Sequence, residues 1–229
     1  MPEQAVLVND DFSSFQIEDW GLTSYQIAMD RQLDLVEKVK AGDMKDTLIF
    51  CTHPPVVTLG RSSRPEDLDG WTGEVYEVSR GGRATYHGPS QLIIYPILSL
   101  ESEARTILHR KDIHAYLRCL ELSLIRTLQT YGLDPEIKPT SDFKSELLNM
   151  TGVWVGGRKV VSIGVAVRSW VTYHGIALNV DRDPEAFKGL KPCGFSQSTM
   201  VSMEELLHHS INREELKIRL IEAFNHYLC

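Results

Sequence analysis

Apolar residues recur at helical spacing in two long segments of the chain. The first, residues 22–41, places its apolar side chains near one face and is followed by Gly42, a residue type that often ends helices. The second, residues 112–131, begins at Asp112, whose short carboxylate suits a helix N-cap. We therefore predict two amphipathic helices, each with one face packed on a core.

Short apolar runs bounded by glycine, proline or polar residues predict strands between and after these helices. Pro96 lies inside one of them, which indicates an edge strand or a bulge, because proline cannot donate a backbone hydrogen bond. The predicted strands cover residues 47–53, 56–60, 74–79, 91–98 and 153–156.

The longest strand signal is a pair of runs, residues 158–168 and 170–180, separated by a tight connection. A two-residue turn at Ser169-Trp170 makes them a hairpin in which Lys159 lies opposite Val180. Side chains alternate along a strand, so a regular strand places Lys159 on the same face as the apolar residues 161, 163 and 165. A lysine buried there has a lowered pKa and can act as a base; alternatively, Lys159 lies past the strand end and reaches water.

Together these elements predict an α/β protein of the α+β type, with a mixed or antiparallel sheet and flanking helices. Strands and helices do not alternate regularly, which disfavours a doubly wound parallel sheet. The chain has no internal repeat and no Pro/Ser-rich linker, so we expect a single domain over residues 1–229.

Composition and charge argue against several classes of function. The net charge of -7 disfavours nucleic-acid binding, because such binding needs a strong positive field. No apolar run is long enough to cross a bilayer, and the start MPEQAVLVNDD lacks the features of a secretory signal. We therefore expect a cytoplasmic protein whose cysteines are reduced thiols.

Among the four cysteines, Cys193 has the context most like that of a nucleophile. It stands between Pro192 and Gly194, which indicates a turn, and Lys191 lies nearby. A thiol titrates at roughly 8.5 and becomes more acidic beside cations, so such a neighbour favours the reactive thiolate. A pair formed by Cys193 and Lys159 would follow the general logic of an activated nucleophile with a base. The alternative is that Cys193 is a small buried hydrophobic residue.

A second candidate segment is RGGRATYHGPSQ, residues 80–91. Two adjacent glycines allow unusual backbone angles or a close approach of a ligand, although an ordinary connecting loop is the alternative. The spacing is not that of a phosphate-binding loop. The histidines lack the spacing of metal ligands and G-x-S-x-G is absent, so we expect neither a metal site nor a serine hydrolase.

The segment RGGRATYHGPSQLIIYPI closely resembles the signature of the lipoyl(octanoyl) transferase family of lipoate biosynthesis. THPPVVTLGR, GRKVVSIGVAV, VTYHGIALNV and the tripeptide PCG are similar to further blocks of that family and occur in its order, over most of residues 50–205. The resemblance implies the fold of the biotin and lipoate protein ligases. It also implies transfer of an octanoyl group, a medium-chain acyl group, from octanoyl-acyl carrier protein to a lysine of a lipoyl domain, the first step of endogenous lipoate biosynthesis. The implied acceptors are the lipoyl domains of 2-oxoacid dehydrogenase complexes and the glycine cleavage H protein.

This resemblance assigns roles to particular residues. Cys193 matches the cysteine that carries the acyl thioester, and Lys159 matches the lysine that lowers the pKa of that cysteine. The implied substrate-binding residues are Arg80, Gly81, Gly82, Arg83, Ala84, Thr85, Tyr86, His87, Ser162, Ile163, Gly164, Gly175, Ile176 and Ala177. No cofactor is implied, and we expect a monomer. Ser90 stands where family members commonly carry glycine, and a left-handed backbone there would strain the serine.

Several alternatives remain open at this stage. An ATP-dependent lipoate or biotin ligase would share the fold without needing the cysteine, and a non-catalytic lipoyl-domain binding module would need neither Cys193 nor Lys159. An amidotransferase that moves lipoyl groups between proteins would differ in its donor. Basic residues could form a rim for an acidic carrier protein, or be scattered surface charges. These residues are Arg61, Arg64, Arg80, Arg83, Arg158, Lys188 and Lys191.

Overall fold

The computed structural model describes residues 14–102, 105, 108–138 and 151–229. Its main element is a seven-stranded mixed sheet, in which β1 and β2 are parallel and the other neighbours are antiparallel. In spatial order its strands are β1 (Gln16–Leu22), β2 (Thr47–Thr52), β6 (Gln91–Ile97), β10 (Val171–Asn179), β9 (Arg158–Arg168), β8 (Gly152–Val155) and β7 (Pro135–Glu136). A three-stranded sheet lies beside it, in the order β4 (Glu74–Glu77), β3 (Val56–Leu59) and β5 (Thr85–His87).

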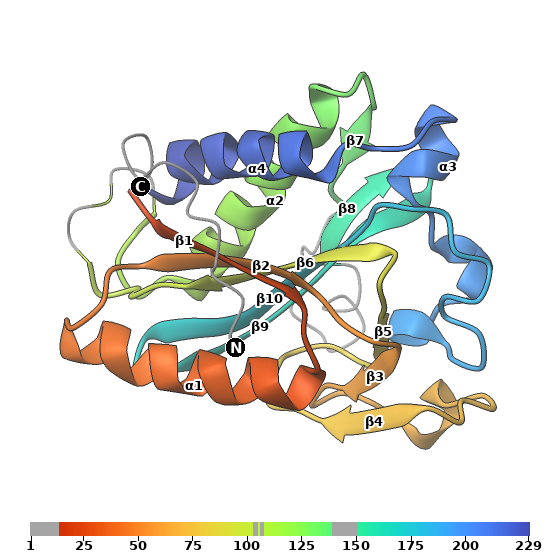
Figure 1. Ribbon diagram of the computed structural model, residues 1–229, viewed down its shortest axis with the longest axis horizontal. Helices are drawn as coiled ribbons and strands as arrows, with labels where there is room; N and C mark the ends of the chain where they lie inside the picture. The colour runs from red at the N-terminus through yellow and green to blue at the C-terminus, as the bar shows by residue number, and fades with distance from the viewer. Residues whose placement is uncertain (1–13, 103–104, 106–107, 139–150) are drawn as a thin grey trace.

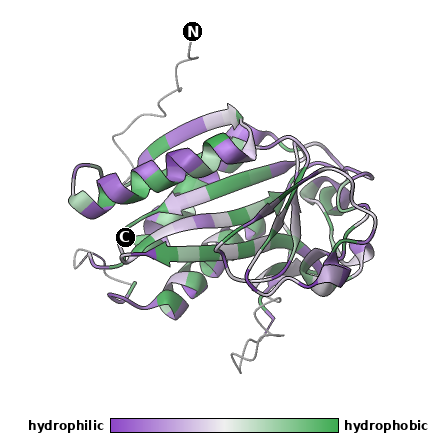
Figure 2. Cartoon of the chain, turned by 90° about the horizontal axis from the view of Figure 1, so that it is seen from below, coloured by the Kyte–Doolittle hydropathy of each residue, from purple (hydrophilic) through white to green (hydrophobic). Residues whose placement is uncertain are grey.

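Helices cover both faces of the large sheet (Figure 1). The helix α1 (Tyr25–Ala41) packs on one face, and α2 (Ile113–Gln129) and α4 (Arg213–Leu228) pack together on the other. A short helix, α3 (Met203–Leu207), precedes α4. Figure 2 shows mostly hydrophobic strands between helices that alternate hydrophobic and hydrophilic residues, as one-sided burial requires. In the described part of the chain, no helix has the length and apolar character needed to cross a membrane.

The fold class predicted from the sequence is confirmed, and so are both long helices. Gly42 ends α1 in a left-handed conformation, and the Asp112 side chain accepts a hydrogen bond from the Ala115 N–H at 2.9 Å. Three strands were missed: β1, β5 and the two-residue strand β7. β1 carries too many polar residues to give an apolar run, and β5 is a three-residue strand inside the segment that we expected to be a loop. The edge-strand interpretation of Pro96 was wrong, because β6 lies between β2 and β10.

The predicted hairpin of β9 and β10 is confirmed, with its turn at Ser169-Trp170. The predicted face of Lys159 was wrong. β8 and β9 change register between Val153 and Trp154, so that Val153 pairs with Val161 but Trp154 pairs with Lys159. The extra residue is a β-bulge, which reverses the alternation and places Lys159 on the same face as Ser162 and Gly164.

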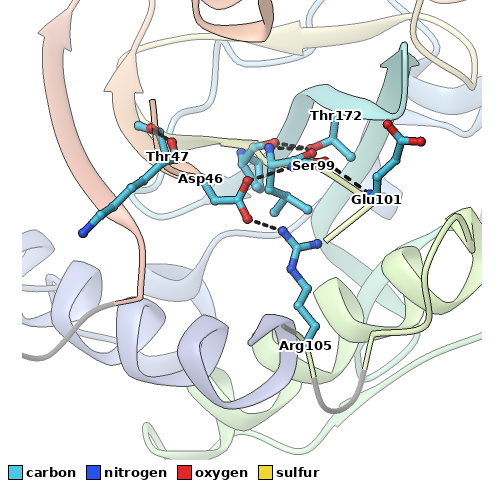
Figure 3. A network of polar contacts seen from close by, with 9 residues as sticks. Asp46, Thr47, Ser99, Glu101, Arg105 and Thr172 are labelled. Carbon is cyan, nitrogen blue, oxygen red and sulfur yellow. Dashed lines mark hydrogen bonds and ion pairs between the residues drawn. The ribbon is translucent and has the colours of Figure 1, made fainter. Parts of the chain in front are cut away.

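A polar network joins residues just before β2 to residues just after β6 (Figure 3). The Asp46 carboxylate, just before β2, accepts a hydrogen bond from the Ser99 N–H at 2.8 Å and forms an ion pair with Arg105. The Arg105 side chain is 5% exposed, so the ion pair is largely shielded from water. Nearby, the Thr172 hydroxyl donates to the Pro96 carbonyl at 2.7 Å. These contacts join the beginning of β2 to the segment that follows β6.

We predict that Asp46→Ala lowers the free energy of unfolding by about 3 kcal/mol, because it leaves a buried guanidinium without its carboxylate. Urea denaturation followed by circular dichroism measures this change. Asp34→Ala, which removes an exposed ion pair with Lys38 on α1, is the matched control and should leave the urea midpoint nearly unchanged. Equal effects of the two substitutions would contradict the structural role of Asp46.

Candidate active site

Cys193 lies in a 3-10 turn, Pro192–Gly194, in the loop that follows β10. Its backbone is left-handed, with φ 53° and ψ 21°, a conformation that residues other than glycine rarely adopt. The Cys193 N–H donates to the Ala84 carbonyl at 2.8 Å, which ties the turn to the beginning of β5. The strained conformation therefore fixes the direction of the thiol.

A buried aspartate holds this turn in place. Asp67 accepts a hydrogen bond from Arg83 Nε at 3.2 Å and forms a close ion pair with Arg83 Nη2, which raises the pKa of Arg83. The Asp67 carbonyl accepts from the Lys191 N–H at 2.9 Å. Gly194, at φ 80°, is needed beside this pair, because a Cβ there would lie 2.1 Å from Arg83 Nη1.

Lys159 approaches Cys193 from β9. Its Nζ lies 3.9 Å from Cys193 Sγ, and the residue is only 1% exposed, so the interpretation that it reaches water was wrong. Burial lowers the pKa of Lys159, and the neighbouring Cys193 and the carboxylate of Glu121 oppose that shift. Gly152 separates Glu121 from the lysine: its N–H donates to Glu121 Oε1 at 3.2 Å, and a Cβ on it would lie 2.9 Å from Lys159 Cε.

Arg80 is a second buried basic residue in the same pocket. Its Nη2 donates to the Thr58 carbonyl at 2.8 Å and to the Thr58 hydroxyl at 2.7 Å, and its Nη1 donates to the Gly81 and Arg83 carbonyls. Among the described residues it has no carboxylate partner and its Nε has no hydrogen-bond partner. Burial lowers the pKa of Arg80, while Tyr25 and Cys193 act in the opposite direction.

These residues line one pocket between the large sheet, the small sheet and the Cys193 turn. It contains all the site residues expected from the sequence except Ala84 and Tyr86, which point into a separate apolar cluster because side chains alternate along β5. The sequence analysis did not assign five other lining residues to the site. These are Tyr25, Ile93, Tyr95, Thr151 and His174.

Histidines and tyrosines lie together near α1. Tyr25, Tyr95 and His174 line the pocket, and His53 contacts the two tyrosines. His53 Nδ1 donates to the Thr23 carbonyl at 2.7 Å, so its Nε2 accepts a hydrogen bond from the Tyr95 hydroxyl, also at 2.7 Å. His174 Nδ1 lies 3.4 Å from the Tyr25 hydroxyl. Burial lowers the pKa of His53, and burial together with Arg80 lowers that of His174 to about 3. Both rings are therefore uncharged near neutral pH.

The structure does not show the expected basic residues as one set of exposed, unpaired charges. Arg80 is buried and is not part of any rim, and four other members are paired with carboxylates. Within the described ranges, Arg61 and Arg158 are the two remaining members, and neither has an acidic partner. Ser90 is not left-handed and so carries none of the strain that we considered; its hydroxyl donates to Asp183 Oδ2 at 3.0 Å. Metal-ligand geometry is also missing from the described residues, which contain no cluster of three His, Cys, Asp or Glu side chains able to hold an ion.

Comparison with known proteins agrees with this geometry. Residues 24–225 match the model of the lipoyl protein ligase A/B catalytic domain. An octanoyltransferase of Bdellovibrio bacteriovorus is 47% identical over 213 residues, which cover 90% of this chain and 97% of the relative. The chain belongs to the octanoyltransferase family. An octanoyltransferase of Nostoc punctiforme is 40% identical over 209 residues, covering 89% of this chain and 84% of that protein.

Solved structures confirm the fold predicted for an octanoyltransferase-family protein. A bipartite lipoate protein ligase from Thermoplasma acidophilum superposes with a TM-score of 0.64 at 17% identity, covering 94% of this chain and 84% of that one. At this level of identity the likeness concerns the fold alone. The family resemblance stated from the sequence motifs is confirmed by the octanoyltransferase relatives.

The neutral histidines predict a dependence of stability on pH. The pKa of His174 is about 3 in the folded protein and near 6.5 in the unfolded chain. Between these values the unfolded chain binds a proton that the folded protein does not, so stability falls as the pH decreases from 6.5 toward 3. Each such histidine contributes a slope of about 1.4 kcal/mol per pH unit.

Urea denaturation at pH 7, 6 and 5 tests this linkage. His174→Asn keeps a residue type that tolerates the local backbone. It should reduce the slope of the free energy of unfolding against pH by the contribution of one histidine, about 1.4 kcal/mol per pH unit. His209→Asn, on the exposed loop after α3, is the control and should leave the slope as it is. An unchanged slope in His174→Asn would show that this histidine is not held neutral by the fold.

Proposed function

We propose that this protein transfers an octanoyl group from acyl carrier protein to a lysine of a lipoyl domain, through a thioester on Cys193. The observation that carries the proposal is the 3.9 Å separation of Lys159 Nζ and Cys193 Sγ at a buried pocket. The octanoyltransferase names of the relatives support the acyl group and the type of reaction.

In the first step, Lys159 accepts the thiol proton of Cys193, and the thiolate attacks the carbonyl carbon of the octanoyl thioester. Burial lowers the pKa of Lys159, which favours its neutral amine and so its role as the base. The tetrahedral intermediate collapses, the carbon–sulfur bond to the carrier protein breaks, and the departing thiolate takes the proton from Lys159 to become a thiol. One thioester replaces another, so the step needs no nucleoside triphosphate.

In the second step, the amine of the acceptor lysine attacks the acyl-enzyme. The carbon–sulfur bond breaks, an amide forms, and the proton lost by the attacking nitrogen returns to Cys193 through Lys159. Conversion of a thioester to an amide is downhill and therefore drives the transfer forward.

Arg80 supplies the positive charge of this site. Its guanidinium is held by backbone carbonyls and by Thr58, so it does not have to reorganise when negative charge develops. We propose that it stabilises the thiolate and the oxyanion of the intermediate at long range, together with backbone N–H groups of the glycine-containing segments.

The partners and the setting belong to the same proposal. The Thermoplasma acidophilum neighbour is described with its E2 lipoyl domain, which supports lipoyl domains as acceptors. We propose further that the donor is octanoyl-acyl carrier protein, that residues 1–229 act as one domain, and that the protein is a cytoplasmic monomer without a cofactor. An ATP-dependent ligase is the second candidate, favoured by the likeness to a structure of lipoate-protein ligase A bound with ATP, which has a TM-score of 0.63.

Intact-protein mass spectrometry after mixing with octanoyl-acyl carrier protein, without ATP, tests the proposal. We expect a gain of one octanoyl mass that hydroxylamine removes. Cys193→Ala should abolish the adduct because it removes the nucleophile, and Cys229→Ala, which removes another partly accessible thiol, should retain it.

The remaining outcomes separate the candidates. An adduct that forms only when ATP and free octanoate are supplied would overturn the transferase in favour of a ligase. Binding of a lipoyl domain with no acyl transfer under either condition would favour a non-catalytic module.

A further inference from the structure

Glu121 is a buried carboxylate on a helix face that is otherwise mostly apolar. It lies on α2 among buried leucines of the same helix and is only 4% exposed. Burying a charged carboxylate is costly unless donors or cations compensate it. Burial raises the pKa of Glu121, and the Gly152 N–H, Arg118 and Lys159 oppose that shift. These three partners therefore decide what the carboxylate does in the fold.

Two contacts hold the Glu121 carboxylate at the sheet. Arg118 Nη1 lies 3.1 Å from Oε2, but the Arg118 side chain is 49% exposed, so water weakens this ion pair. The Gly152 N–H donates to Oε1 at 3.2 Å. Gly152 is the first residue of β8 and pairs with Ser162 on β9. The hydrogen bond thus joins α2 to the strand next to the one that carries Lys159.

Gly152 also brings Lys159 close to this carboxylate. A Cβ on Gly152 would lie 2.1 Å from the Val161 carbonyl oxygen and 2.9 Å from Lys159 Cε. One residue without a side chain therefore contacts Lys159 on one side and donates to Glu121 on the other. Burial lowers the pKa of Lys159, and Cys193 and Glu121 act in the opposite direction.

Other charged groups face Lys159 from the remaining elements around it. Cys193 Sγ lies 3.9 Å from Nζ, and Arg80 lowers the pKa of Lys159. The Lys138 ammonium lies 4.0 Å from the centroid of the Trp154 ring, and Lys159 Nζ lies 5.5 Å from the same centroid. Both cations disfavour a further positive charge on Lys159. An ammonium buried beside them needs a compensating negative charge.

We propose that Glu121 is a positioning residue that, across Gly152, stabilises the ammonium form of Lys159 beside Cys193. This inference rests on the proposed function, because it concerns the proton transfer within the same reacting pair. In that transfer the S–H bond of Cys193 breaks and an N–H bond forms on Lys159, so an ammonium and a thiolate replace an amine and a thiol. Glu121 keeps its own protonation state. Without its negative charge the equilibrium returns toward the amine and the thiol, and less thiolate is present at neutral pH.

The test compares Glu121→Gln with the wild-type protein. Glutamine keeps the size of the side chain and an oxygen that accepts from the Gly152 N–H, but it removes the charge. The rate at which iodoacetamide alkylates Cys193 reports the thiolate without any substrate, and mass spectrometry of the Cys193 peptide follows it from pH 6 to 10. We expect the midpoint of this profile to rise by about one pH unit and the rate below the midpoint to fall about tenfold.

Arg118→Gln is the matched control. It breaks the same ion pair from the exposed side but leaves the Glu121 carboxylate charged, so the midpoint should not rise. An equal rise in Arg118→Gln and Glu121→Gln would assign the effect to the packing of α2 and would overturn the role of the charge.

A Lys159→Met background tests whether Glu121 acts through the lysine. No ammonium is present there, so adding Glu121→Gln should leave the alkylation profile of Cys193 unchanged. Urea denaturation gives a second readout that does not need Glu121→Gln to fold alone. The double variant should have a urea midpoint no lower than that of Lys159→Met, because the carboxylate has already lost its ammonium. A clearly lower midpoint in the double variant would contradict the coupling.

The outcomes distinguish this inference from the proposed function. If the wild-type protein forms the octanoyl thioester but Glu121→Gln keeps the wild-type alkylation profile, the role of Glu121 is overturned and the transferase function stands. If the wild-type protein forms no acyl-enzyme under any condition, the proposed function is overturned and this inference with it.

Discussion

Two basic side chains, Lys159 and Arg80, are buried in the same pocket, and much of the surrounding structure compensates for the cost of burying them. Arg80 is surrounded by backbone carbonyls of its own loop and by Thr58 of the small sheet. Gly60 and Gly164 are required on either side of it, because a Cβ would lie 2.7 Å from Arg80 Nη1 at the first and 3.0 Å from Cδ at the second. The guanidinium therefore connects the two sheets at the point where the pocket forms.

The cost of burying a basic side chain also explains the bulge in β9, the irregularity of the large sheet near the site. The bulge in β9 turns Lys159 toward Cys193, away from the apolar face that packs on α2 and α4. Without the bulge, the Lys159 side chain would face aliphatic side chains and would not approach the Cys193 thiol. Glu121 and Cys193 then offset part of the desolvation of the lysine, so a residue that could not be buried alone becomes part of a coupled pair.

Periodicity along the chain was sufficient to predict the two long helices and the β9–β10 hairpin, because each is stabilised by contacts within one segment. It could not predict β1 or β5, whose pairing partners lie elsewhere in the sequence, nor the bulge that changes the face of Lys159. The motifs did identify the loop of Arg80 and the turn of Cys193 as chemical candidates. Their meeting in one pocket, and the participation of Tyr25 and His174, depend on packing between distant segments that no local pattern records.

Backbone strain is found at two residues that line this pocket, Cys193 and His174, which are both left-handed. Such conformations persist only where surrounding contacts over-determine them. Around Cys193 these contacts are the Ala84 carbonyl and the Asp67–Arg83 pair, and around His174 they are Gln32 and Tyr25 of α1. Because independent parts of the fold supply the two sets, the position of the thiol and the position of the imidazole are fixed separately.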